Sequence, residues 1–204
     1  MNADEFETTR LLVRKILEKP HEHAWPIQGL GMLRLYLSPK IRLHIWNPVA
    51  PYKVENVSEL HNHPWNFAST IIVGALNNHV YTDDWPHRRG TLWCTGVIEC
   101  GPKPAHKGPA LGPTRKLVQT TQPVRLGETY LMKAETIHRT EAIPGTVTIC
   151  NRRPLPDPDH ATVCWPVGTE WVSAEPRDAT TDEVYAFTRV ALARMDAENE
   201  GRLL

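Results

Sequence analysis

The amino-acid sequence predicts a mainly β fold, a sandwich or barrel of many short strands with one helix near each end. Through the middle of the chain, apolar and polar residues alternate over short runs, which is the period of a strand with one buried face. Apolar residues at helical spacing occur in two flanking segments. The 18 prolines among 204 residues favour strand ends and loops, because proline is poorly tolerated inside helices and central strands.

The individual elements follow from these two periods. A helix is predicted over about 4–18, ended by Pro20, and a second over about 181–198, where Thr180 and Glu183 form a capping box. The second helix carries one apolar stripe, made of Val184, Phe187, Ala191 and Met195. Strand-like runs occupy residues 33–37, 41–46, 69–73, 76–81, 91–99, 115–119, 129–132 and 146–151.

Three stretches between these elements are irregular. Residues 82–90 and the Pro/Gly-rich segment 101–113 interrupt the strand pattern, and the second is either a lid or an ordinary surface loop. Segment 154–179 is again rich in proline and is predicted to wrap the barrel. A chain of this length is expected to form one domain over 1–204.

Composition narrows the classes of partner. The 23 basic and 23 acidic residues balance, so electrostatics give no reason to expect binding to nucleic acid or to an anionic membrane. No run approaches the roughly 20 apolar residues of a membrane span, and the first residues are acidic where a signal peptide would be basic. The four cysteines form no Cys-x-x-Cys pair, which favours free thiols in a cytoplasmic protein over a disulfide framework.

The segment from Glu59 to Gly74 carries the strongest chemical signal. Side chains two apart on a strand point to the same face, so His61 and His63 are expected to project together. Imidazole is the commonest protein ligand for transition metals, and two on one face form half of a metal site. A second His-x-His, His21 and His23, falls in a predicted loop and is the weaker candidate.

Two segments resemble the motifs of the cupin superfamily. Residues 61–74 resemble the first motif, in which His-x-His is followed by a glycine at the position of Gly74, and residues 127–138 resemble the second in length and in its terminal Gly127 and His138. Lys133 and Glu135 replace the inner proline and glycine of the second motif. The resemblance covers about 31–152 and implies a cupin double-stranded β-helix, or jelly-roll barrel, as the core between the two helices.

The resemblance also implies a metal site of three histidines, His61, His63 and His138. The glutamate ligand usual in cupins would fall where Phe67 and Ala68 stand, so the set is similar to that of cysteine dioxygenase-like enzymes. Three neutral ligands leave coordination positions open for an anionic substrate and O2, which favours Fe(II), with Zn, Ni, Mn or Cu as alternatives. A cupin that uses its histidines without a metal, as sugar epimerases do, is a further alternative.

Two carboxylates near the histidines have ambiguous roles. Glu59 precedes His61 by two residues and is a candidate ligand, orienting partner or catalytic base, or a solvated residue at a strand start. Glu141, three residues past His138, carries the same ambiguity.

Substrate-binding candidates come from the strands around the motifs. Arg42 is the first candidate anchor for a carboxylate or phosphate, because guanidinium binds oxyanions through two parallel hydrogen bonds. The alternative is a solvent-exposed strand face. The other candidates are His44, Tyr130, and Trp65 or Phe67, one of which is expected to keep the metal dry unless both are plain core residues. The rival anchors are Arg115, Arg152 and Arg153.

The sequence is compatible with three functions. The first is a mononuclear non-haem Fe(II) oxygenase or dioxygenase acting on a small anionic metabolite. The second is a non-redox isomerase, epimerase or lyase with a histidine or Glu59 as base. The third is a ligand-sensing cupin without catalysis. By analogy with cupins a homodimer is expected, with the N-terminal helix and residues 165–171 as the suspected surfaces.

Overall fold

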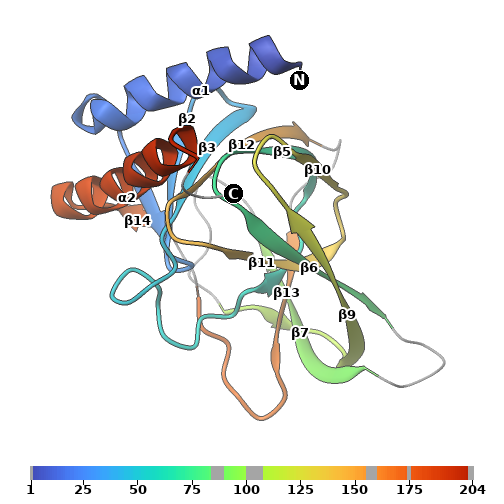
Figure 1. Ribbon diagram of the computed structural model, residues 1–204. Coiled ribbons are helices and arrows are strands. Elements are labelled where there is room, and N and C mark those ends of the chain that lie inside the picture. Colours follow the sequence, from blue (N-terminus) through green and yellow to red (C-terminus); the bar gives the residue numbers. More distant parts are fainter. Residues whose placement is uncertain (1, 84–89, 100–107, 155–159, 174–175, 202–204) are drawn as a thin grey trace.

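The computed structural model describes residues 2–83, 90–99, 108–154, 160–173 and 176–201 (Figure 1). The described chain is mainly β, with a closed barrel and a helix at each end, as the sequence predicts. The helices are α1 (Ala3–Glu18) and α2 (Thr181–Asn199), and a 3-10 turn, η1 (Pro20–Glu22), follows α1.

The first of two sheets is open and has seven strands. Its strands lie in the order β10 (Thr129–Met132), β5 (Trp65–Val73), β12 (Thr146–Pro154), β3 (Ile41–Trp46), β2 (Met32–Tyr36), β1 (Pro26–Gln28) and β14 (Arg177–Asp178). All its neighbours are antiparallel, so segments far apart in the sequence, such as β5 and β12, pair along most of their length.

The second sheet closes on itself. Its order is β13 (His160–Pro166), β4 (Leu60–His61), β11 (Ile137–Ala142), β6 (Leu76–Asp83), β9 (Arg115–Val124), β7 (Thr91–Glu99) and β8 (Ala110–Leu111). Because β13 also pairs with β7, the first six of these strands form a ring, here called the six-strand ring. Each strand of the ring contributes one side chain to the cluster that fills it, namely Leu60, Tyr81, Trp93, Leu117, Ile137 and Cys164.

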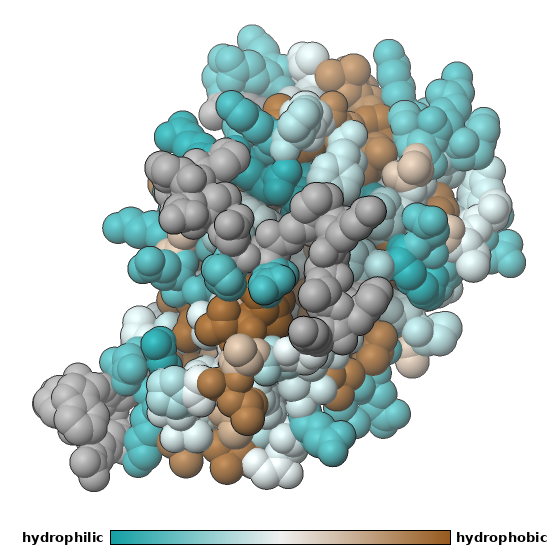
Figure 2. Space-filling view, turned by 180° about the vertical axis from the view of Figure 1, so that it is seen from behind, coloured by the Kyte–Doolittle hydropathy of each residue, from teal (hydrophilic) through white to brown (hydrophobic). Residues whose placement is uncertain are grey.

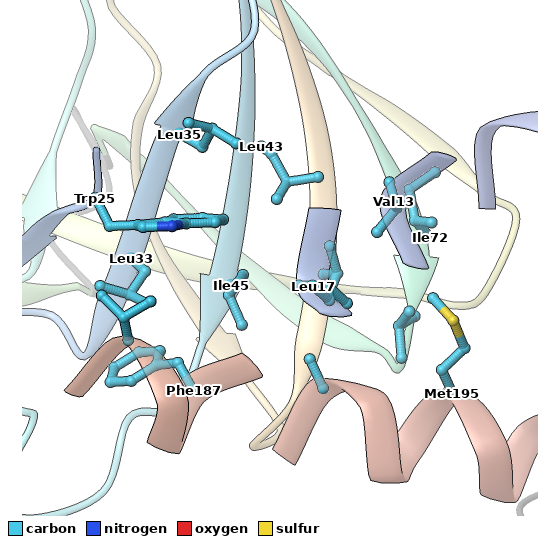
Figure 3. Close-up of a cluster of buried hydrophobic side chains, with 14 of the residues drawn as sticks. Val13, Leu17, Trp25, Leu33, Leu35, Leu43, Ile45, Ile72, Phe187 and Met195 are labelled. Carbon is cyan, nitrogen blue, oxygen red and sulfur yellow. The ribbon is translucent and has the colours of Figure 1, made fainter. Parts of the chain in front are cut away.

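Both helices cover the face of the first sheet that is turned away from the ring (Figure 3). The predicted stripe of α2 lies in this core, where Phe187 is fully buried among Leu33 and Ile45. Helix α1 adds Val13 and Leu17 to the same core. Each helix begins with a capping box, and the one at Thr180 is the one predicted from sequence. The helices therefore bury the apolar face of the alternating strands β2 and β3.

A second apolar core lies between the first sheet and the ring. It joins Trp46, Phe67 and Tyr130 of the first sheet to Leu76 and Val124 of the ring. Because side chains alternate along a strand, the polar residues of β2 and β3 lie on this same side. From the sequence alone, this polar face could equally have been exposed to solvent. The space between the two sheets is therefore the place where apolar and charged side chains meet.

The predicted helices and the eight predicted strands are all present, several of them longer than expected. Strands β11 and β13 were not predicted, although β11 carries His138. Segment 154–179 is therefore not only a wrapping loop, because β13 and β14 lie within it. Most of 82–90, residues 101–107 of the predicted lid or loop, and Cys100 lie outside the described residues. Cys94, Cys150 and Cys164 are free thiols.

The surface mixes polar and apolar side chains (Figure 2). Neither described helix has the length and hydropathy that a membrane span requires. Helix α1 exposes Leu11 and Leu12, 61% and 56% accessible, on the side away from the core. The homodimer and its two suspected surfaces stay predictions.

Candidate metal centre

Three histidine rings converge between the first sheet and the six-strand ring. The ring centroids of His61, His63 and His138 are 4.7, 5.0 and 5.1 Å apart, so they form a nearly equilateral triangle. One potential ligand atom from each lies within 4.8 Å of the others. No other group of three His, Cys, Asp or Glu side chains in the described part of the chain comes close enough to hold a metal ion, and this excludes His21 and His23 as half of such a group.

Backbone carbonyls orient two of the three imidazoles. The Nδ1 atom of His61 lies 2.7 Å from the carbonyl oxygen of Glu59, and Nδ1 of His138 lies 3.1 Å from that of Thr136. A carbonyl can only accept, so each Nδ1 is the protonated nitrogen and each Nε2 keeps its lone pair. Fixing the tautomer through the second nitrogen is how proteins prepare histidine for a metal.

The strand pairing brings the ligands together in a way only partly expected. His61 and His138 are direct partners across β4 and β11. His63 does not continue the strand of His61, as the sequence reasoning assumed, because β4 ends at His61 and β5 begins at Trp65. The intervening Asn62 instead pairs with Thr162 of β13 through its backbone N–H and through its side-chain oxygen. This anchored link holds His63 beside His61 without a regular strand.

Aromatic residues of β5 form the wall behind the histidines. The ring of Trp65 stacks on His63 at 5.1 Å with 18° between the planes, and Phe67 meets His63 edge-on at 5.3 Å. Phe67 also lies 6.0 Å from His138 and 5.9 Å from Tyr130. Burial raises the pKa of Tyr130 to about 12, so its hydroxyl stays protonated at neutral pH. The wall is apolar and keeps the polar interactions at the site strong.

Burial also keeps the histidines neutral. It lowers the pKa of His138 to about 3, with His61 adding to the effect, and it lowers the pKa values of His61 and His63 as well. A metal ligand must be unprotonated, so at neutral pH these rings are ready to donate three lone pairs. The donor set therefore fits a divalent transition metal.

Two of the arginines predicted as anchors, Arg42 and Arg152, lie on the wall of the first sheet that faces the histidines. The Cζ atoms of Arg42 and Arg152 lie 5.2 and 5.0 Å from the ring of Trp65, which itself stacks on His63. Arg34 of β2 joins them, and sequence reasoning missed it as a site residue. Its signal was present, because Arg34 alternates with leucines as Arg42 alternates with isoleucine and leucine.

His44 lies on the same wall, one alternation along β3 from Arg42. Its Nε2 is buried without a hydrogen-bond partner among the described residues, and its ring meets Trp46 edge-on. Burial, followed by the three neighbouring arginines, lowers its pKa to about 3. This histidine is therefore neutral and surrounded by positive charge.

The two ambiguous carboxylates have partners of their own. Glu59 forms an ion pair with Lys53 and lies 3.9 Å from Arg139. Since Arg139 follows His138 on β11, its side chain points to the opposite face from the histidine. Glu141 contacts His79 at 2.8 Å, Oε2 to Nε2. Neither position favours a ligand or base role, and that role for Glu59 stays a prediction.

The other two rival anchors, Arg115 and Arg153, are separate from this wall. Arg153 is exposed and, as the next residue after Arg152, points to the other face of β12. Arg115 is exposed on β9 of the six-strand ring, opposite Trp93 of β7.

The glycines of both motifs occupy backbone positions that need glycine. Gly74 has φ of 78° at the turn between β5 and β6, and a Cβ there would lie 2.6 Å from Oγ1 of Thr146. Gly127 has φ of 80° in the turn before β10. The first turn leads into β6, which pairs with the strand that bears His138, and the second leads into β10, which pairs with β5. The turns therefore give the two motif glycines a structural reason.

No protein-family model matches the chain, and a search of curated proteins gives no match either. The closed barrel and the cluster of three histidines are compatible with a metal-binding protein of the cupin-like jelly-roll type.

Proposed function

We propose that this chain is a mononuclear non-haem Fe(II) oxygenase of cupin type that acts on a small anionic metabolite. The observation that supports the proposal is the convergence of three neutral imidazoles, with ligand atoms within 4.8 Å, beside a wall of arginines. When bound, Fe(II) supplies the redox chemistry by which dioxygen oxidises a substrate. The protein's own residues bind, orient and isolate the reactants.

Each group of residues has a definite part in this proposal. His61, His63 and His138 would hold the metal, and with no carboxylate among them they leave its double charge to be balanced by the substrate. Phe67 and Trp65 exclude water from one side of the site. Tyr130 remains a hydrogen-bond donor and not a base at neutral pH, because burial raises its pKa to about 12.

The proposal is tested first by the metal content of the purified protein, measured by plasma mass spectrometry. Wild type is compared with His138→Ala and with His21→Ala, which removes a histidine outside the cluster. We expect close to one equivalent of iron in wild type and in His21→Ala. His138→Ala lacks one of the three proposed ligands. Mutation of a residue that only orients a ligand typically lowers metal affinity by about 10- to 100-fold, so we expect His138→Ala to lower it by at least this factor.

The same samples separate the competing functions. Oxygen uptake that depends on an added anionic metabolite and on iron supports the oxygenase. Zinc or nickel in place of iron, with turnover under anaerobic conditions, supports the isomerase, epimerase or lyase reading. Wild-type protein that binds no metal after anaerobic addition of Fe(II), or full retention of metal by His138→Ala, contradicts the proposed centre.

A further inference from the structure

Three guanidinium groups form a continuous array on the wall that faces the histidines. The ring of Tyr36 connects the first two, with Cζ of Arg34 at 5.8 Å and Cζ of Arg42 at 4.8 Å from its centroid. The ring of Trp65 connects Arg42 to Arg152, at 5.2 and 5.0 Å. Strand register places all three on one face, because Tyr36 pairs with Arg42 and Arg152 pairs with Phe67.

The array lacks a counter-charge in the described part of the chain. Ion pairs there involve other basic residues, and none reaches Arg34, Arg42 or Arg152. Among the described residues, the Nε atom of each of the three is buried without a hydrogen-bond partner, and Arg152 donates through Nη2 to the neutral carbonyl of Pro39. Aromatic faces stabilise cations but do not neutralise them. Three positive charges therefore share one partly buried wall.

Such an arrangement is unfavourable for the protein by itself. Buried charges are normally paired, and a buried N–H group without an acceptor is unfavourable because it loses its hydrogen bonds to water. Burial lowers the pKa values of Arg34 and of Arg42, the latter to about 10, with the neighbouring arginines adding to both effects. A buried donor on the same wall, Nε1 of Trp46, is also unpartnered in the described structure. Unpaired donors and unbalanced positive charge on this wall of the folded protein indicate a ligand that supplies hydrogen-bond acceptors and negative charge.

We propose that Arg34, Arg42 and Arg152 bind a doubly charged oxyanionic group, a phosphate ester or a pair of carboxylates, at the end of the substrate remote from the metal. This inference rests on the proposed function, because it assigns the far end of that site's substrate. A single carboxylate would balance one of three charges and could form fork-like hydrogen bonds with only one or two guanidinium groups.

Trp65 sets the distance between the two ends of the substrate. The ring of Trp65 stacks on His63 and also lies beside the guanidinium groups of Arg42 and Arg152. The indole therefore lies between the histidine cluster and the array. Tyr36, at the other end, is 48% exposed, so the array extends to the surface. The substrate is accordingly a small molecule with a metal-binding head and a separate dianionic tail.

The test uses the full chain, freed of metal by chelation and then dialysed, so that anions cannot bind to the metal. Calorimetric titration at pH 8 and constant ionic strength measures the binding of inorganic phosphate and of succinate, with acetate as the singly charged comparison. We expect saturable binding of phosphate and succinate and at least roughly tenfold weaker binding of acetate, because charge-assisted hydrogen bonds are lost.

Matched variants locate the binding site. Arg42→Gln and Arg34→Gln are expected to weaken phosphate binding by roughly 10- to 100-fold, the effect of losing a hydrogen bond to a charged group. Arg42→Lys keeps the charge and should retain part of the affinity. Arg153→Gln, the exposed neighbour on the same strand as Arg152, should bind phosphate as wild type does. Circular dichroism checks that each variant is folded.

His138→Ala separates this inference from the proposed metal centre, because phosphate binding to the array does not require the third histidine. Unchanged binding in His138→Ala supports the array even if no metal is found. The inference is overturned if wild type binds phosphate no better than acetate, if Arg42→Gln and Arg34→Gln bind it as tightly as Arg153→Gln does, or if His138→Ala abolishes binding.

Discussion

Substitution of His44 by glutamine tests whether the wall of the first sheet that faces the histidines is as buried and as positively charged as its contacts indicate. His44 has a buried Nε2, and burial together with Arg34, Arg42 and Arg152 lowers its pKa from 6.5 to about 3. In the unfolded chain the same imidazole returns to a pKa of about 6.5. Glutamine keeps a polar side chain of similar reach but does not titrate.

The sign and size of the effect follow from proton binding. Between pH 6.5 and about 3 the unfolded protein holds a proton on His44 that the folded protein does not, so stability is fully present above pH 6.5 and is lost as the pH falls. The slope for one such group is about 1.4 kcal/mol per pH unit. Lowering the pH from 7.5 to 5.0 therefore removes about 2 kcal/mol through His44 alone.

Urea denaturation at the two pH values, in the absence of metal, measures this difference. His44→Gln should lose about 2 kcal/mol less than wild type between pH 7.5 and 5.0, because the other histidines contribute to both proteins equally. His160→Gln, which changes an exposed histidine on β13, is the control and should behave as wild type. If His44→Gln loses as much stability as wild type, the imidazole titrates normally in the folded protein and the description of the wall is wrong.

Three further predictions, the last with a matched control variant, concern separate parts of the structure. Glu59→Gln should keep the metal content of wild type, because His61 is oriented by the backbone carbonyl of residue 59 and not by its carboxylate; loss of metal would restore a ligand role. Arg42→Gln should raise the free energy of unfolding of the ligand-free protein by about 1–2 kcal/mol in urea denaturation, because burial lowers the pKa of Arg42 to about 10 and solvent screening removes part of that penalty. Phe187→Ala should lower it by about 3–5 kcal/mol, since this ring is fully buried against both the sheet and Tyr52, whereas Leu131→Ala, at a side chain 79% exposed, should change it by less than about 0.5 kcal/mol.

The parts of the fold that depend on local sequence were predictable. Both helices and the cap at Thr180 depend on contacts within a few residues, and the structure has them where the sequence indicates. Strand β11 was not predicted because its sequence, Ile-His-Arg-Thr-Glu-Ala, shows little apolar alternation. One face of this strand contributes to the histidine cluster and the other faces the ring interior, so neither face is uniformly apolar. Strand β13 was obscured by the prolines around it.

The clustering of the three histidines was predictable, but the surroundings of the cluster were not. His61, His63 and His138 stand in a spacing that can be read from the chain, whereas the role of Arg34 depends on what covers each face of β2. Alternation tells which residues share a face, and it does not tell which face meets solvent. Here the helices cover the leucine face, so the arginine face turns toward the six-strand ring. Which face is covered is a tertiary property, and one of the two helices that decide it, α2, lies more than a hundred residues from β2 in the sequence.

The first sheet therefore separates stability from chemistry by its two faces. On the helix side, Phe187 and Met195 of α2 and Leu17 of α1 pack on the strands in an apolar core. The charged groups buried beside it, Arg10 of α1 and Glu198 of α2, form an ion pair with each other. On the other side the same strands hold three guanidinium groups that have no ion-pair partner among the described residues, and the burial of such charge is unfavourable for folding. The helices lie outside the segment that resembles cupins, yet they stabilise the strands that carry the arginines. The apolar side chains that the helices bury on the opposite face stabilise the same strands and so offset the cost of the cationic wall.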